Sequence, residues 1–156
     1  MKKKLTILLI VLAVCCVFFT ACKTDGKPPQ QPFESSVTIV IQGEKVIVSY
    51  EADLSGGNFN SSSTVLDVLI YLKDTAGLTY SGGGSGSTFF LNSIGHLNPG
   101  TGEFVAVMTS VENDFSREDW ATPFEYKGVL LKSGKSSIGE LSIAADAIIL
   151  FTLSTW

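Results

Sequence analysis

The sequence predicts an α+β fold in which one principal helix packs on a mixed or antiparallel β-sheet. After residue 36 the chain consists mostly of short runs rich in β-branched and aromatic residues, separated by glycine, proline, serine and asparagine. Only the segment 64–77 has the apolar spacing of an amphipathic helix. Residues 147–153 (AIILFTL) form an uninterrupted apolar run of the kind expected in a central strand.

The N-terminus has the features of an export signal. Three lysines at positions 2–4 precede an apolar run that ends with the small residue Ala21, directly before Cys22. The run is too short to span a bilayer comfortably, so we interpret residues 1–21 as a signal peptide. The ending Phe-Thr-Ala-Cys resembles a bacterial lipobox, in which cleavage precedes a lipidated cysteine, although Phe19 replaces the usual leucine. We therefore expect a lipoprotein anchored through Cys22 in a bacterial cell envelope, with its domain outside the cytoplasm. Ordinary signal cleavage near Ala21 and an uncleaved membrane anchor are the alternatives.

Removal of the signal changes the composition. The mature chain would keep eight Lys/Arg and all fifteen Asp/Glu, a net charge of −7. An acidic surface repels phosphate backbones, so nucleic acid is excluded as a partner. Cys15 and Cys16 leave with the signal and Cys22 is consumed by lipid, so no thiol remains for a disulfide, a metal or a nucleophile.

The domain organisation follows from composition. Residues 22–36 carry the lipidated cysteine and a proline-containing, apolar-poor segment that reads as a flexible tether. Residues 37–156 are long enough for one domain with its own core, but not for two.

The first elements are a predicted hairpin and the helix. Residues 37–41 and 46–50 are two β-rich runs around a Gly-Glu turn. In the helix, Thr64 and Asp67 have the spacing of a capping box, and Gly77 suits the C-terminal cap. The expected buried face consists of Val65, Leu66, Leu69, Ile70 and Leu72.

The remaining elements are predicted strands. Thr79-Tyr80 is a short strand candidate, and residues 81–87 (SGGGSGS) are expected to form a flexible loop. No Lys-Ser/Thr and no helix follow these glycines, so they are not a phosphate-binding loop. The later strand candidates are residues 89–94, 104–111, 124–131 and 147–153.

Three segments together carry a family resemblance. STVLDVL (63–69), FFLNSIG (89–95) and the closing stretch 137–156 occur in this order. They resemble the helix start, a strand and the final strand of the bacterial DUF4430 domain. That domain is similar to the C-terminal domain of the vertebrate cobalamin carriers transcobalamin and intrinsic factor. The resemblance covers residues 37–156 and implies a β-grasp-like fold and a cobalamin or corrinoid ligand. In the carriers a separate helical domain shares the ligand, and no such domain fits in this chain.

The sequence also departs from the family pattern. Gly102-Glu103-Phe104 stands where the family often has Gly-Trp, and Ala145-Asp146 replaces the Gly-Asp before the last strand. Residues 114–124 form a longer loop that resembles the tryptophan-containing loop of the carriers. These departures weaken the transfer of individual ligand contacts.

Catalysis is not expected, because the chain lacks a nucleophile with an activating base. His96 is the single histidine and lies in a predicted turn. An ordinary surface histidine is one interpretation, and an axial ligand to a corrin cobalt or part of a zinc site are the others. Glu112, Asp114 and Glu118-Asp119 form an acidic cluster, read either as a solvated loop or as a weak calcium site.

Aromatic residues supply the candidate binding site. Five of them fall in or beside the long loop, namely Phe104, Phe115, Trp120, Phe124 and Tyr126. Such side chains can form one wall of a pocket for a planar ligand such as a corrinoid or haem. The alternative is that Phe104 and Tyr126 face the core, whereas Trp120, among polar neighbours, is expected to be partly exposed.

These observations leave three functional hypotheses. The first is a membrane-tethered binding module for a planar ligand, acting alone or with a partner protein. The second is a surface module that binds proteins or glycans through the aromatic loop. The third, an envelope hydrolase, is disfavoured by the absence of catalytic groups.

Overall fold

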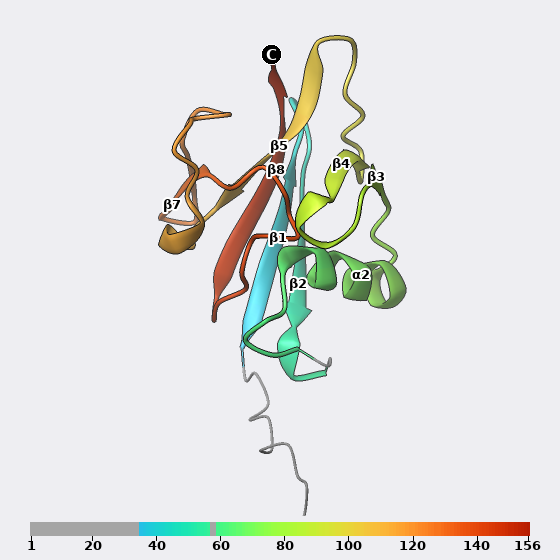
Figure 1. Ribbon diagram of the computed structural model, residues 1–156, viewed down its shortest axis with the longest axis vertical. Helices are drawn as coiled ribbons and strands as arrows, with labels where there is room; N and C mark the ends of the chain where they lie inside the picture. The colour runs from blue at the N-terminus through green and yellow to red at the C-terminus, as the bar shows by residue number, and fades with distance from the viewer. Residues whose placement is uncertain (1–34, 57–58) are drawn as a thin grey trace, which may run out of the picture. The chain divides into compact units, whose positions relative to one another are not determined.

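The computed structural model of the chain describes residues 35–56 and 59–156 (Figure 1). The predicted signal peptide, Cys22 and nearly all of the predicted tether lie outside these residues. Residues 35–56 and 59–156 belong to one compact unit. Within the described ranges, no helix is long and apolar enough to cross a membrane.

The fold is α+β, as predicted. Six strands form one mixed sheet in the order β2-β1-β8-β5-β7-β6. Their bounds are β1 Ser36–Gln42, β2 Ile47–Asp53, β5 Glu103–Thr109, β6 Phe124–Tyr126, β7 Val129–Ser133 and β8 Ala147–Thr155. Neighbouring strands are antiparallel except for β1 and β8, which run parallel. An N-terminal hairpin, a helix on the sheet and a last strand beside the first make the topology β-grasp-like.

Smaller elements surround this sheet. The helix α2 spans Val65–Ala76, and a second, antiparallel sheet contains β3 and β4. The bounds of the small elements are β3 Tyr80–Gly83, β4 Phe90–Ile94, η1 Leu54–Gly56, η2 Gly86–Thr88 and η3 Glu112–Asp114, where η denotes a 3-10 turn. In Figure 1, α2 and the β3–β4 hairpin lie on the same side of the main sheet.

The apolar run predicted as a central strand lies in the interior of the sheet. Strand β8 pairs with β1 on one side and β5 on the other, and residues 147–151 are all buried. Both faces of the strand are covered. Ile149 and Phe151 belong to the large cluster under α2, whereas Ile148 and Leu150 belong to a second cluster on the opposite face. This double burial explains why the run is continuous rather than alternating.

The ends of α2 form as the sequence predicts. The Asp67 carboxylate accepts a hydrogen bond from the Thr64 N–H at 2.7 Å, which completes the capping box. Gly77 adopts the left-handed conformation (φ +67°), and its N–H donates to the Leu72 carbonyl.

The buried face of α2 differs from the prediction, because Val68 is buried although it was not predicted and Leu66 is only partly buried. Val65, Val68, Leu69 and Leu72 are buried, which is the i, i+3, i+4, i+7 stripe of an amphipathic helix. The inclusion of Ile70 was wrong, because its side chain is 47% exposed. Position 70 lies about 100° around the helix from position 69, which turns it away from the sheet.

The adjacent residues Leu69 and Ile70 provide a matched test of this packing. We expect Leu69→Ala to lower the free energy of unfolding by about 2–5 kcal/mol, because the fully buried side chain leaves a cavity. Ile70→Ala should cost less than about 1 kcal/mol, since that side chain is half exposed. Urea denaturation measures both values. Equal effects of the two substitutions would contradict this helix orientation.

Two other predicted segments have different structures. Residues 124–131, expected as one strand, are two strands joined by a tight turn in which Lys127 and Gly128 both have positive φ. The predicted loop 81–87 begins as strand β3, which runs to Gly83, and ends in η2. Position 82 requires glycine, because a Cβ there would lie 2.3 Å from the Phe90 carbonyl oxygen.

Candidate functional site

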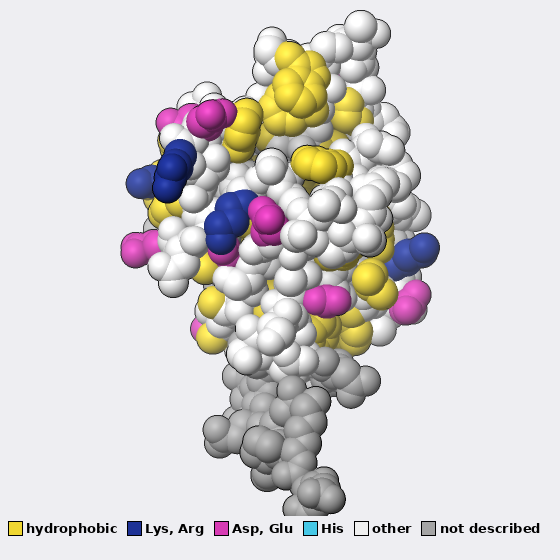
Figure 2. All heavy atoms as spheres, in the orientation of Figure 1, with side chains coloured by type: hydrophobic (Ala, Val, Ile, Leu, Met, Phe, Trp, Pro, Cys, Tyr) yellow, Lys and Arg dark blue, Asp and Glu magenta, His cyan; other side chains and the backbone are white. Residues whose placement is uncertain are grey.

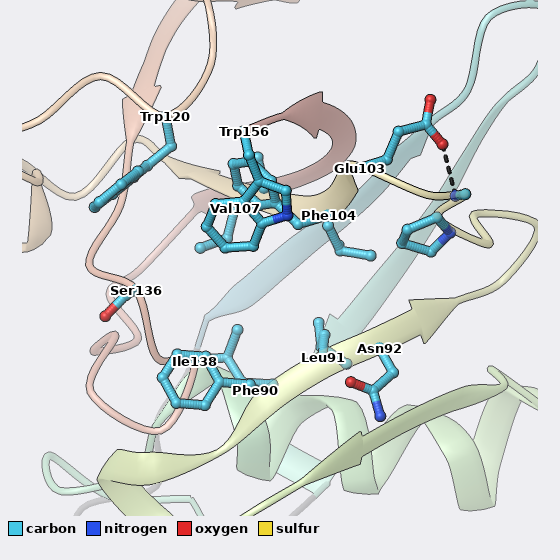
Figure 3. Close-up of a pocket in the computed structure, with 14 residues that line it drawn as sticks. Phe90, Leu91, Asn92, Glu103, Phe104, Val107, Trp120, Ser136, Ile138 and Trp156 are labelled. Carbon is cyan, nitrogen blue, oxygen red and sulfur yellow. Dashed lines mark hydrogen bonds between the residues drawn. The ribbon is translucent and has the colours of Figure 1, made fainter.

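An apolar groove lies beside the N-terminal half of β5 (Figure 3). Its volume is about 600 Å³, within the range of small-molecule pockets. Trp120 and Trp156 lie on one side of the groove, and Phe90 and Ile138 lie on the other. The floor is strand β5 itself, from Glu103 to Val107.

Segments that are far apart in the sequence supply these walls. Phe90 and Leu91 come from β4, Trp120 from the loop before β6, Ile138 from the loop before β8, and Trp156 from the C-terminus. The ring of Trp156 packs against that of Phe104 with a centroid distance of 4.5 Å. Trp156 is nevertheless 86% exposed, so the groove opens toward solvent at this end. Figure 2 shows hydrophobic side chains gathered on the upper part of this face.

Side-chain hydrogen bonds fix the Trp120 wall. The Ser154 hydroxyl on β8 donates to the Trp120 carbonyl oxygen at 2.6 Å. The Ser133 hydroxyl at the end of β7 accepts from the Ala121 N–H at 3.1 Å. The peptide unit between Trp120 and Ala121 is therefore held to two different strands, which restricts the position of the indole before any ligand arrives.

The opposite wall is fixed by the close approach of two loops. The Ser137 hydroxyl donates to the Phe89 carbonyl oxygen at 3.0 Å. A Cβ on Gly139 would lie 1.8 Å from the Gly86 carbonyl oxygen, so only glycine permits this contact. These contacts hold β4 against the loop that carries Ile138.

The groove is suited to binding apolar and aromatic groups. Among the described residues that line it, Glu103 is the one charged side chain, and its carboxylate accepts a hydrogen bond from the Gly100 N–H at 2.7 Å (Figure 3). Asn92 and Ser136 add neutral polar groups at the rim. The indole Nε1 of Trp120 is buried and has no hydrogen-bond partner among the described residues.

Two of the predicted site residues meet in the groove. Phe104 and Trp120 both line it, although they are 16 positions apart in the sequence. Trp120 is partly buried, in agreement with its expected partial exposure. Phe104 is half-buried and contributes to the groove rather than to either core cluster.

The other predicted site residues lie elsewhere. Phe124 and Tyr126 on β6 pack against the cluster of Val40, Met108, Leu131, Ile148 and Leu150, which covers the face of the sheet opposite α2. Phe115 does not line the groove, and the Lys132 ammonium lies 5.3 Å from its ring centroid. Strand order explains the position of Phe124 and Tyr126, because β6 is at the edge of the sheet two strands beyond β5.

His96 also lies outside the groove. It is exposed in the turn after β4, beside the β1–β2 turn, where a Cβ on Gly43 would lie 2.8 Å from its Nε2. In the described parts of the chain, no three His, Cys, Asp or Glu side chains gather in an arrangement that could hold a metal ion. The structure therefore places His96 as a surface residue packed on a neighbouring turn.

Sequence reasoning missed Phe90, Ile138 and Trp156. Phe90 is 55% exposed, and the neighbouring Phe89 packs against the core. The doublet Phe89-Phe90 within a predicted strand contained a usable signal, because alternation must turn one of the two rings away from the core. No comparable signal marked Ile138, which lies in the loop before β8, or Trp156, whose position depends on the pairing of β8 with β5.

One residue of the predicted acidic cluster, Asp114, is buried rather than solvated. Asp114 is only 3% exposed, and its Oδ1 accepts a hydrogen bond from the Lys135 ammonium at 2.8 Å. Its Oδ2 accepts from the N–H and the hydroxyl of Ser142, both at 2.6 Å. Burial raises the pKa of Asp114, but the bonds from Lys135 and Ser142 outweigh that effect and lower it below its ordinary value. Asp114 thus joins its own loop to two points of the β7–β8 connection, whereas Glu112, Glu118 and Asp119 are exposed.

The chain was compared with protein-family models, curated proteins and solved structures. No protein-family model matches the chain, and no curated protein matches it. Among solved structures, the chain is similar to one described as a "putative metal binding protein" from Ruminococcus gnavus, with 10% sequence identity and a TM-score of 0.47. The match covers 79% of this chain and 99% of that chain.

Proposed function

We propose that this protein is a membrane-tethered lipoprotein whose domain binds a flat, largely apolar ligand in the groove beside β5. The observation that carries the proposal is the convergence of Phe90, Phe104, Trp120 and Trp156 on one groove of about 600 Å³. Aromatic rings provide large, rigid contact areas for planar ligands. The hydrogen bonds that hold both walls reduce the ordering needed on binding.

A corrinoid is the first ligand to test, and the reason is the resemblance to the DUF4430 domain and the cobalamin carriers. A groove of this size takes one face or edge of a tetrapyrrole-sized molecule and leaves the rest accessible to a partner protein. Haem is the second ligand, because it presents a similar planar surface. The binding role is proposed to be without catalysis, since the groove lining includes one carboxylate, Glu103, and no histidine or cysteine.

Binding should be measurable by intrinsic fluorescence. The chain contains two tryptophans, and both line the groove. Titration of the fragment 23–156, which contains the whole compact unit, with cobalamin, cobinamide and haem should quench tryptophan emission and shift the absorbance of the ligand. Absence of binding at high micromolar concentrations of all three would remove the tetrapyrrole proposal for the isolated chain.

The central mutational prediction concerns Trp120. Trp120→Ala should weaken binding of the tetrapyrrole by about 1–3 kcal/mol, a loss of about 5- to 150-fold in affinity, because one aromatic wall is removed. His96→Ala is the matched control and should leave affinity unchanged, since His96 lies outside the groove. Absorbance titration gives both affinities, and urea denaturation checks that each variant is folded. Equal affinities of both variants would show that the ligand binds elsewhere.

The anchoring part of the proposal rests on Cys22. Cys22→Ser should prevent lipid attachment and yield either unprocessed precursor or a product that leaves the detergent phase, because serine lacks the thiol that accepts the diacylglycerol. Metabolic fatty-acid labelling with detergent phase partitioning measures this. The neighbouring substitution Lys23→Ser should retain the label. Labelling of the Cys22→Ser protein at the wild-type level would refute the lipoprotein assignment.

A further inference from the structure

The groove contains an unpaired strand edge. Strand β7 pairs with β5 only at Met108 and Thr109, and the chain then turns away. The segment of β5 from Glu103 to Val107 consequently has β8 on one side and the groove on the other. An open edge of this kind is a template for another extended chain.

The register shows which backbone groups face the groove. Hydrogen bonds from Ser110 to Ile148 and from Trp156 to Gly102 set the phase of the β5–β8 pairing. In an antiparallel pair the bonded positions alternate, so even-numbered residues of β5 bond to β8 and odd-numbered residues point the other way. The N–H and C=O of Val105 therefore point toward the groove.

These groups have no partners among the described residues. On the groove side of β5, the Glu103 N–H donates to the Gly100 carbonyl, and the Val107 carbonyl accepts from the Gly134 N–H at 2.9 Å. Between them remain the Glu103 C=O, both groups of Val105 and the Val107 N–H, for which no described hydrogen bond exists. Alternating donors and acceptors at strand spacing are complementary to an extended peptide backbone.

The side chains around this edge match the two faces of an added strand. Phe104 and Trp156 stack on the sheet face that carries the second cluster, and Trp120 is bonded to Ser154 of β8 at that face. Leu91 and Ile138 belong to the cluster under α2. Because successive side chains of a strand point to opposite faces, an added strand would insert apolar residues into both parts of the groove.

The charges near the groove favour a basic partner. Glu103 lines the groove, and the exposed Glu118 and Asp119 directly precede Trp120, with Arg117 as the one basic residue of that run. The mature domain has a predicted net charge of −7. Basic residues flanking an apolar segment would be attracted to this rim, while an acidic segment would be repelled.

We propose that the β5 edge binds an extended peptide segment of another protein by strand addition. The segment has alternating apolar residues and flanking Lys or Arg. This inference goes beyond the proposed planar-ligand function and uses the same groove, so the two ligands would compete. It also gives the protein-interaction hypothesis a specific binding mode. In this mode the peptide pairs with the β5 edge, and Val105 supplies the central pair of backbone hydrogen bonds.

Val105→Pro is the decisive variant. Proline removes the N–H that faces the groove, and the position tolerates proline because that N–H has no partner in the sheet. Val105→Ala is the control, since it removes the side chain but keeps the N–H. The probe is a random octapeptide library displayed on phage, panned against the immobilised fragment 23–156, followed by synthesis of enriched peptides with and without N-methylation at alternate residues.

We expect enriched peptides to be apolar and basic, and to bind Val105→Pro at least about tenfold more weakly than they bind Val105→Ala. N-methylation should weaken binding only at every second peptide residue, because only those N–H groups face β5. Amide exchange measured by NMR provides a second readout that does not need the proline variant to fold: the Val105 and Val107 amides should exchange rapidly in the free protein and become protected in the complex.

Three results would overturn the proposal. The first is no enrichment, or enriched peptides that are insensitive to both N-methylation and Val105→Pro. The second is slow exchange at Val105 in the free monomer, which would show that the edge is already paired. The third is a concentration-dependent dimer that Val105→Pro abolishes, which would assign the edge to a second copy of this chain. Corrinoid binding of the same variants is measured in a separate titration. A failure of corrinoid binding therefore does not contradict peptide binding, and a failure of peptide binding does not contradict corrinoid binding.

Discussion

Replacing Ile149 with aspartate is expected to abolish folding of the domain. Ile149 is fully buried in β8, between β1 and β5, and its side chain belongs to the cluster under α2. An aspartate there would be a buried charge with no available partner, or would have to be protonated at a cost. The expected destabilisation exceeds about 5 kcal/mol, which is comparable to the whole stability of a small domain.

Ile47→Asp is the matched control for this substitution. Ile47 begins the edge strand β2 and is 53% exposed, so the same change of side chain should cost less than about 1 kcal/mol there. Circular dichroism and urea denaturation of the fragment 23–156 distinguish the two variants. A cooperative unfolding transition near the wild-type midpoint for Ile149→Asp would contradict the central position of β8.

Asp114→Ala is expected to have the second largest effect, a loss of about 3–5 kcal/mol. The carboxylate is almost completely buried and accepts three hydrogen bonds, from the Lys135 ammonium and from two donors of Ser142. Lys135 is 40% exposed and can be rehydrated, so most of the loss comes from the two donors of Ser142, which is partly buried and would be left without this acceptor. Urea denaturation at neutral pH measures the change.

The same residue predicts a pH dependence. The pKa of Asp114 is lowered in the folded protein, so its contribution is fully present above the ordinary value of 3.8 and declines as the pH falls toward the lower native value. In that window the unfolded chain binds a proton that the folded protein does not. The difference in stability between wild type and Asp114→Asn should therefore be constant from about pH 7 to 5 and shrink below about pH 4.

Glu118→Ala controls for general charge effects in this comparison, because Glu118 is an exposed carboxylate of the same segment. Its effect on stability should stay below about 0.5 kcal/mol at every pH tested. The stability difference between wild type and Asp114→Asn could instead grow as the pH falls. That result would contradict the predicted direction and would show that burial, rather than hydrogen bonding, dominates the pKa of Asp114.

The fold class was readable from the sequence because local rules agreed with the final packing. Thr64, Asp67 and Gly77 mark the helix ends through contacts within a few residues, and these contacts form as predicted. The continuous apolar run of β8 indicated a strand covered on both faces. Predictions were wrong where the same residues are compatible with two structures. Residues 124–131 could form one strand or a hairpin, and they form two strands joined by a turn at Lys127-Gly128.

The candidate site was only half predictable. An aromatic-rich loop pointed to Trp120 and Phe104, yet it pointed equally to Phe124 and Tyr126, which cover a hydrophobic cluster instead. The difference lies in strand order: Phe104 is on β5, whose edge is open, whereas Phe124 and Tyr126 are on β6 at the far side of β7. Composition alone cannot distinguish a ring that fills a groove from a ring that covers the core.

The sequence by itself determined the order of the elements, the helix with its caps and the central apolar strand. Only the tertiary structure decided that β7 leaves β5 after two residue pairs, that Trp156 packs on Phe104, and that Asp114 is buried against Lys135 and Ser142. The physical reason is the sequence separation between the residues that make each contact. Caps and apolar periodicity arise from neighbours within one or two turns of chain, whereas the open edge and the groove arise from segments tens of residues apart whose register no local pattern records.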